Sequence, residues 1–296
     1  MTCGGTRPAR ASSALQASVE VRRTDPLQVA SKAPTTNPRF AAQHRTRNEP
    51  NRWKSIQTRC TARRTKSMKQ RSTYLTLTTF AAAMALLEAS VVIYMRRLYY
   101  PENPLDLFPL AFLSSYDPTL EFARELATIV MLVTVAMLAE RTNVTRTFAA
   151  FVFLFGSWDI FYYFWLKVLL GWPRHWLEWD VLFLVPTIWL GPWISPALIA
   201  LLFVVWGTAI LLSAKNYNFT LWGFLTFVLG AAAGLVTFLQ PAISVWMVGG
   251  MPALMSYRPA NFWWWLFVPS FFAMALGLGS SFWSARHVTK NDNSPV

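Results

Sequence analysis

Residues 148–170 read FAAFVFLFGSWDIFYYFWLKVLL, and this stretch decides the class of protein. A helix needs about 20 mostly apolar residues to cross the hydrocarbon core of a bilayer, and the stretch is long enough. Asp159 and Lys167 are its only charged residues. The sequence therefore predicts a membrane-spanning helix with one acid near its middle.

Five further stretches of similar length and character flank this one. Of the 296 residues, 54% are hydrophobic and only 14% are charged, which is about half the charged fraction of an ordinary soluble domain. We therefore expect an all-α integral membrane bundle of about six transmembrane helices. The expected spans are residues 74–95, 120–139, 148–170, 195–214, 219–240 and 262–285. They make up a membrane domain over residues 73–286, and a short polar tail follows at 287–296.

Residues 172–193 lie between two expected spans and have a different character. Trp172, Trp176 and Trp179 recur at helical spacing, and Pro186 and Pro192 follow. Tryptophan favours the membrane–water interface, and closely spaced prolines interrupt a helix. We expect an interfacial or re-entrant segment here and no seventh crossing.

The basic residues of the loops predict the orientation. Arg141, Arg146 and Lys215 fall in loops on the same side as the basic N-terminal region, and Arg286 and Lys290 follow the last span. Because basic loops remain on the cytoplasmic side, both termini are expected inside. The expected location is the inner or plasma membrane of the cell.

The N-terminal residues 1–72 carry all of the formal net charge of +13, because basic and acidic residues balance from Ser72 onward. This stretch is rich in Arg, Ser, Thr and Pro without periodicity, so we expect disorder. Three interpretations stay open: an organellar presequence, which would place the protein in an organellar inner membrane; a basic tail attracted to anionic lipid or nucleic acid; or an over-extended reading frame with Met68 as the true start. Nucleic acid is disfavoured as a partner because no folded basic face is evident.

Acidic residues in or beside the expected spans predict a polar site. Ionisable groups inside a bilayer are costly and usually face the helix bundle or water. Under the expected topology, the four acids Glu88, Glu125, Asp159 and Asp180 all fall in the outer half of the bilayer. With neighbouring basic and tyrosine side chains, the candidate intramembrane site comprises Glu88, Arg96, Glu125, Asp159, Tyr163, Lys167 and Asp180. Such a site could bind a cation, relay a proton or hold a lipid head group.

A purely structural interpretation competes with this one. Glu88 could pair with Arg96 or Arg97, and Asp159 with Lys167, so that the charges only fix helix register.

Neither a metal site nor a cofactor is expected. The histidines after the N-terminal region, His175 and His287, fall outside the spans, and the two cysteines, Cys3 and Cys60, precede them. Gly230 and Gly234 form a small-xxx-small pattern, for which helix contact within the chain is favoured over dimerisation.

Two stretches carry a resemblance to known proteins. Residues 87–101 (LEASVVIYMRRLYYP) and residues 158–173, continuing to Trp179 and Asp180, resemble a group of uncharacterised bacterial multi-pass membrane proteins. The resemblance extends from Met68 to about the end of the fourth span. It implies a prokaryotic plasma membrane and a start at Met68, and it carries no activity.

Three functional hypotheses follow. The first is a non-enzymatic accessory or assembly component held together by buried charge pairs. The second is a transporter or a proton or cation pathway, and the third is a lipid-modifying membrane enzyme. Membrane lipid and either another membrane protein or a second copy of the chain are the expected partners. No phosphate-binding loop, nucleophile elbow or zinc-protease motif occurs, so whether the chain is an enzyme stays open.

Overall fold

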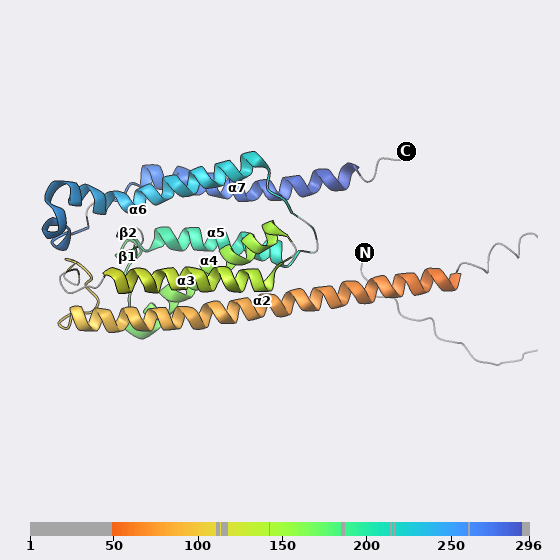
Figure 1. The fold of residues 1–296 in the computed structure, drawn as a ribbon, viewed down its shortest axis with the longest axis horizontal. Helices are drawn as coiled ribbons and strands as arrows, with labels where there is room; N and C mark the ends of the chain where they lie inside the picture. The colour runs from red at the N-terminus through yellow and green to blue at the C-terminus, as the bar shows by residue number, and fades with distance from the viewer. Residues whose placement is uncertain are drawn as a thin grey trace, which may run out of the picture. The chain divides into compact units, whose positions relative to one another are not determined.

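The computed structural model describes residues 49–110, 113, 118–141, 143–184, 187–213, 215, 217–259 and 261–291, and the chain divides into units 1–66 and 67–296. The described residues form six helices and two short strands (Figure 1). The helices are α2 (Glu49–Tyr99), α3 (Pro118–Ala139), α4 (Val144–Leu170), α5 (Ile194–Leu211), α6 (Leu221–Met255) and α7 (Trp264–Asn291). The strands are β1 (Trp179–Phe183) and β2 (Trp189–Pro192). All six helices are long and apolar enough to cross a membrane, so the all-α prediction is confirmed.

Helix α2 begins well before the expected first span. It starts at Glu49 with Pro50 in its first turn, where the missing N–H of proline costs nothing. No Pro or Gly interrupts the chain from residue 51 to residue 99, and Lys, Arg, Gln and Ala are good helix formers. Residues 49–72 are therefore helical where we expected disorder. Residues 1–48 lie outside the described residues, and the expectation for them stays a prediction.

Helix α6 continues beyond its expected end at Gln240. It passes through the buried Pro241 to Gly250, whose φ of 61° is not helical and marks a kink, and a second helical part continues to Met255. Proline is tolerated in apolar helices where neighbouring elements support the backbone. Here Ala242 packs in a buried cluster with Leu190 of β2, so the hairpin supports α6 immediately after Pro241.

The segment after α4 forms an antiparallel β-hairpin, which differs from the expected interfacial or re-entrant segment. Asp180 of β1 lies opposite Gly191 of β2, and a bulge falls between Val181 and Phe183. A Cβ atom on Gly191 would lie 3.1 Å from ring atoms of Phe238 of α6 and of Phe262, so glycine suits this close contact of the strand with the two rings. Residues 172–193 form no helix where they are described, in line with the expectation of no seventh crossing.

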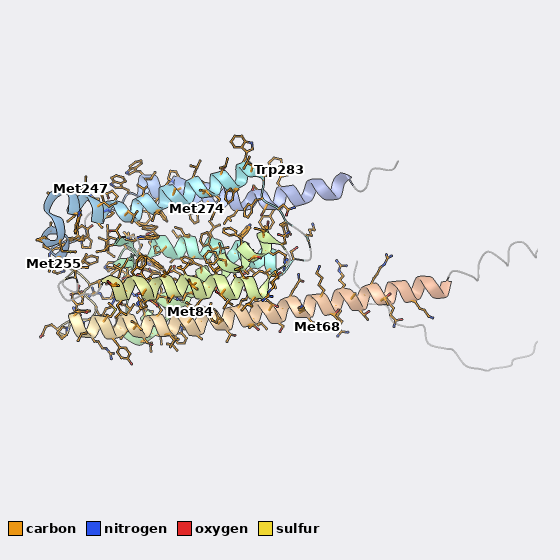
Figure 2. The ribbon with its side chains drawn as sticks, viewed as in Figure 1. Met68, Met84, Met247, Met255, Met274 and Trp283 are labelled. Carbon is orange, nitrogen blue, oxygen red and sulfur yellow. The ribbon has the colours of Figure 1, made fainter. Side chains whose placement is uncertain are left out.

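One end of the bundle, which we call the hairpin end, holds β1, β2 and the C-terminal end of α2 (Figure 1). Met247 and Met255 of α6 lie at this end, and Trp283 of α7 lies toward the other (Figure 2).

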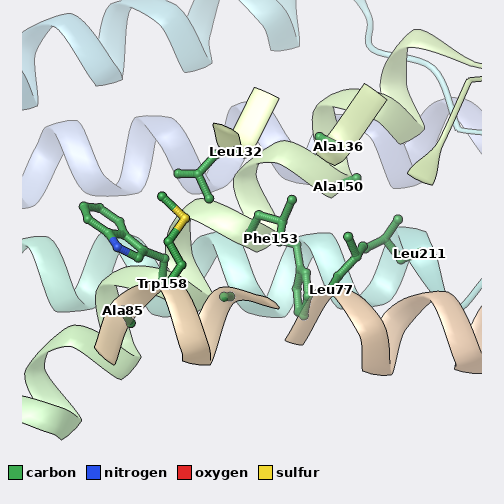
Figure 3. Packing of buried hydrophobic residues seen from close by; sticks show 11 residues of the cluster. Leu77, Ala85, Leu132, Ala136, Ala150, Phe153, Trp158 and Leu211 are labelled. Atoms are coloured by element: carbon green, nitrogen blue, oxygen red, sulfur yellow. The ribbon is translucent and has the colours of Figure 1, made fainter. Parts of the chain in front are cut away.

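Buried apolar side chains join α2, α3, α4 and α5 in one cluster (Figure 3). Its buried members are Leu77, Ala81, Met84, Ala85, Leu132, Ala136, Ala150, Phe153, Leu154, Trp158 and Leu211. The alanines let the helix backbones approach, which is how helices associate where lipid removes most of the hydrophobic driving force.

Helices α6 and α7 pack through glycine. A Cβ atom on Gly230 would lie 2.8 Å from the carbonyl oxygen of Ser270, and one on Gly277 would lie 2.6 Å from the backbone nitrogen of Phe227. The small-xxx-small pattern at Gly230 thus serves a contact within the chain, as expected.

Candidate ligand-binding cavity

A cavity of about 570 Å³ lies among the six helices and the hairpin. Every helix and both strands contribute to its lining, which is mostly apolar and rich in aromatic rings. The charged members of the lining are Glu88, Arg96, Glu121, Arg124, Glu125, Asp159 and Asp180. Five carboxylates and two guanidinium groups therefore surround the space, a formal excess of three negative charges.

Helix α4 supplies the aromatic and acidic wall of the cavity. Trp158, Asp159, Tyr162 and Tyr163 line it together, because residues four apart share one face of a helix. Trp158 and Tyr162 have ring centroids 6.5 Å apart, and Tyr162 and Tyr163 5.1 Å apart. Asp159 is half-buried among them and has no hydrogen bond or ion pair with any described residue. It is thus the acid of the cavity that the described chain leaves without a partner.

Helix α3 supplies a second polar wall through residues spaced three and four apart. Arg124 forms ion pairs with Glu88 of α2 and with Glu121 one turn before it, donating from Nε to Glu121 Oε2 over 2.7 Å. Both of the acids that flank Arg124 are therefore engaged by one guanidinium group, and this network joins α2 to α3.

Glu125, also on α3, contacts the hairpin instead of a base. Both of its carboxylate oxygens lie 3.0 Å from the backbone nitrogen of Leu184, the residue that follows β1, and accept its hydrogen bond. A backbone N–H that would otherwise be unpaired inside the bundle is satisfied in this way. The hairpin is thereby tied to α3.

Arg96 near the end of α2 pairs with Asp180 of β1 over 2.9 Å. The two side chains are only 3% and 2% exposed, and the guanidinium carbon of Arg96 lies 4.2 Å from the ring centre of Trp172. Burial raises the pKa of the Asp180 carboxyl from its ordinary 3.8 to about 6, and the neighbouring Arg96 opposes this rise without cancelling it. A stacked guanidinium and a carboxylate thus compensate each other where water is excluded.

Several buried polar atoms around the cavity lack a hydrogen-bond partner among the described residues. They are Nε and Nη1 of Arg96, Oδ2 of Asp180, and the indole nitrogens of Trp158 and Trp189. All four residues line the cavity. Unsatisfied buried groups are costly, so donors and acceptors gathered around one space indicate that water or a polar part of a ligand fills it.

Six of the seven residues of the expected polar site line this one cavity: Glu88, Arg96, Glu125, Asp159, Tyr163 and Asp180. Lys167 does not. Its amino group donates to the carbonyl oxygens of Gly171 and Pro173, where it satisfies the C-terminal end of α4. The expected pair of Asp159 with Lys167 is therefore wrong, because eight residues of helix separate them by about 12 Å.

The expected pair of Glu88 with Arg96 or Arg97 is also wrong, since Glu88 pairs with Arg124 and Arg96 with Asp180. The expected site omitted Glu121 and Arg124. Their spacing in the sequence already indicated one helix face, but the position of that face opposite Glu88 depends on how α2 and α3 pack. No group of three or more His, Cys, Asp and Glu residues in the described part of the chain could hold a metal ion.

Comparison with known proteins identifies no similar protein, so a function has to be inferred from the geometry of the cavity. No protein-family model matches the chain, and neither a curated protein nor a solved structure is significantly similar to it.

Proposed function

We propose that this chain is a multi-pass membrane protein that binds an amphipathic molecule in the cavity among its helices, as a carrier or transport protein for that molecule. The observation that carries the proposal is the cavity, which combines aromatic walls with buried polar atoms that have no partner among the described residues. Ligand pockets of about 300–1,000 Å³ with apolar walls and a few placed polar groups are typical small-molecule sites.

The surface of the helices supports a place in the bilayer. Large apolar side chains face outward along them, among them Leu87, Leu98, Met247 and Val248. Met247 and Val248 are 79% and 91% exposed, which would be costly in water and is favourable in lipid. With basic loops inside and six crossings, we place both termini of the chain on the cytoplasmic side of a plasma or inner membrane. An organellar inner membrane is the alternative if the N-terminal residues are a presequence.

The side chains of the cavity favour binding over catalysis. The described lining contains no His, Cys, Ser or Lys, so it offers no nucleophile with an adjacent base of the usual kind. A lipid-modifying enzyme would have to work with the carboxylates, the tyrosines, the hydroxyl of Thr128 and the two guanidinium groups. The lining instead holds five carboxylates. Guanidinium and backbone N–H groups bind four of them, and aromatic rings surround the fifth. This arrangement suits recognition of a charged group on a ligand.

A second hollow supports access from the side of the bundle. It has a volume of about 410 Å³ and is lined by Phe122 of α3, Trp246 of α6 and residues at the hairpin turn. Leu184 lines both this hollow and the main cavity. An apolar molecule would reach the cavity between α3 and α6 by moving past the hairpin turn, which Glu125 holds.

Retention of a native ligand tests the proposal. Ala231 of α6 lines the cavity, whereas Ala127 of α3 is exposed. Native mass spectrometry of the full chain, purified in a mild uncharged detergent, should detect a bound amphipathic molecule. Ala231→Phe should lower the bound fraction by at least about tenfold by filling the cavity, and the matched Ala127→Phe should leave it unchanged. Equal retention by both variants, or no bound molecule in the wild type, would contradict the proposal.

A non-enzymatic assembly component is the second candidate, and the Glu88–Arg124–Glu121 network favours it. Those charges compensate one another and need no ligand. On this account the purified wild type binds nothing, Ala231→Phe folds as well as wild type, and the charge network alone determines the level of folded protein.

A further inference from the structure

We infer that the molecule bound in the cavity carries a positively charged ammonium group, and that Asp159 of α4 is its counter-ion. This inference rests on the proposed function, because it names the class of molecule that the same cavity takes. The lining holds five carboxylates against two guanidinium groups. An anionic head group would add negative charge to a space that already has an excess of it.

Both guanidinium groups of the cavity already have carboxylate partners. Arg96 pairs with Asp180, and Arg124 pairs with both Glu88 and Glu121. Glu125 accepts the backbone N–H of Leu184. Among the described residues, Asp159 is the one acid of the lining that has neither a base nor a hydrogen-bond donor. A carboxylate inside a bilayer is costly without a partner, so this position selects a cation from outside the chain.

The rings around Asp159 suit an ammonium group. Trp158, Tyr162 and Tyr163 line the cavity on the same wall as the carboxylate, and their rings follow one another at 6.5 and 5.1 Å. A cation is attracted to the face of an aromatic ring, most strongly where water is excluded. Aromatic rings beside a single acid are a common way to hold an alkylated or primary ammonium group.

The remainder of the cavity suits an apolar body. Helix α6 lines the cavity with small residues, including Ala231, Ala232 and Gly234, and α7 adds Met274. The buried and unpartnered indole N–H of Trp158 can donate to an oxygen of the ligand next to the ammonium group. Both a hydrophobic amine and a lipid with an ammonium head group have this chemistry.

Three probes with one tail and different heads test the inference: dodecylamine, dodecanol and dodecanoate. Binding to the full chain in an uncharged detergent is measured by titration calorimetry. Dodecylamine should bind wild type at least about tenfold more tightly than the other two. Asp159→Asn should remove this preference by weakening dodecylamine binding at least about tenfold. The control Glu102→Gln, which removes an exposed acid outside the cavity, should keep the preference.

The comparison of heads on wild-type protein decides the sign of the charge even if Asp159→Asn does not fold. Dodecanoate binding as tightly as dodecylamine would overturn the inference and leave the proposed function in place. Failure of all three probes, with no native amphiphile retained, would instead contradict the proposed function. The molecule that co-purifies identifies the source. An ethanolamine lipid retained in preference to a glycerol lipid indicates a lipid head group, and a retained amine that is not a lipid indicates a free amine.

Discussion

Two charged clusters of the cavity differ in how completely they are compensated. Arg124 pairs with both Glu88 and Glu121. Arg96 and Asp180 are more deeply buried, and among the described residues two nitrogens of Arg96 and one oxygen of Asp180 have no hydrogen-bond partner. Breaking a buried pair by removing one partner costs more than the pair contributes, because a charge is left behind without compensation. The consequences of a substitution therefore depend on which partner remains.

Arg124→Gln should destabilise the fold by about 2 kcal/mol, since Glu88 and Glu121 lose their shared partner in a half-buried place. The double variant Arg124→Gln with Glu88→Gln should recover part of this loss. The measurement is the apparent unfolding midpoint in detergent, compared over the complete double-mutant cycle. Additive effects of the two substitutions would show that the network contributes no coupling.

The raised pKa of Asp180 predicts a pH dependence of stability. The folded state holds the proton up to about pH 6, whereas the unfolded chain loses it near 3.8. The stability that comes from this group is therefore fully present below about pH 4 and is lost as the pH rises through about 6. Asp180→Asn does not titrate, so the difference in unfolding free energy between wild type and variant should change between pH 4 and 6, by at most about 3 kcal/mol.

Above pH 7 the difference in unfolding free energy between wild type and Asp180→Asn should be constant. Unfolding midpoints of both proteins across pH 4–8 provide the test, with Glu102→Gln as an exposed-acid control that stays parallel to wild type. Parallel curves for wild type and Asp180→Asn would show that the carboxyl does not titrate in this window.

Among the secondary-structure elements, the six helices could be predicted from the sequence, and the hairpin could not. Long apolar runs predict helices by themselves, because the backbone of each run satisfies its own hydrogen bonds. Strands β1 and β2 are short, and Gly191 of β2 lies against Phe238 and Phe262, which are distant in sequence. Ala242, directly after Pro241 of α6, packs in one cluster with Leu190 of the same hairpin. Local sequence patterns therefore predict neither the hairpin nor the extension of α6.

The candidate site was likewise predicted in part from the sequence. The acids and Arg96 were identified from the cost of charge inside apolar spans, and the structure brings six of the seven chosen residues to one cavity. Their partners were not identified. Pairing within one helix was the simplest assumption, but Arg124 reaches Glu88 across two helices and Arg96 reaches a strand.

The α6–α7 interface predicts a position-dependent effect of adding one methyl group. A Cβ atom at Gly277 would lie within 2.7 Å of backbone atoms of α6, whereas one at Gly279 would meet nothing within 4 Å. Gly277→Ala should destabilise the fold by about 2 kcal/mol, and Gly279→Ala should not. Unfolding midpoints of the two variants in detergent compare them directly. Equal midpoints would mean that α6 and α7 are less closely packed than described.

At the scale of the whole molecule, the outward apolar surface and the inward charged cavity follow from one pattern. Helices with an apolar outer surface can still carry ionisable side chains on their inner faces. Inside the bundle those side chains pair with one another or bind a ligand. In this bundle, Asp159 has neither compensation nor a described partner. The molecule that occupies the cavity therefore decides the function of the bundle.

A cryo-electron microscopy structure of the full chain in lipid nanodiscs would show what the cavity holds. We expect elongated density inside the cavity, with its apolar part along α6 and its polar end about 3 Å from the carboxylate of Asp159. A cavity that is closed by its own side chains, or that holds only water beside Asp159, would refute the proposed ligand site.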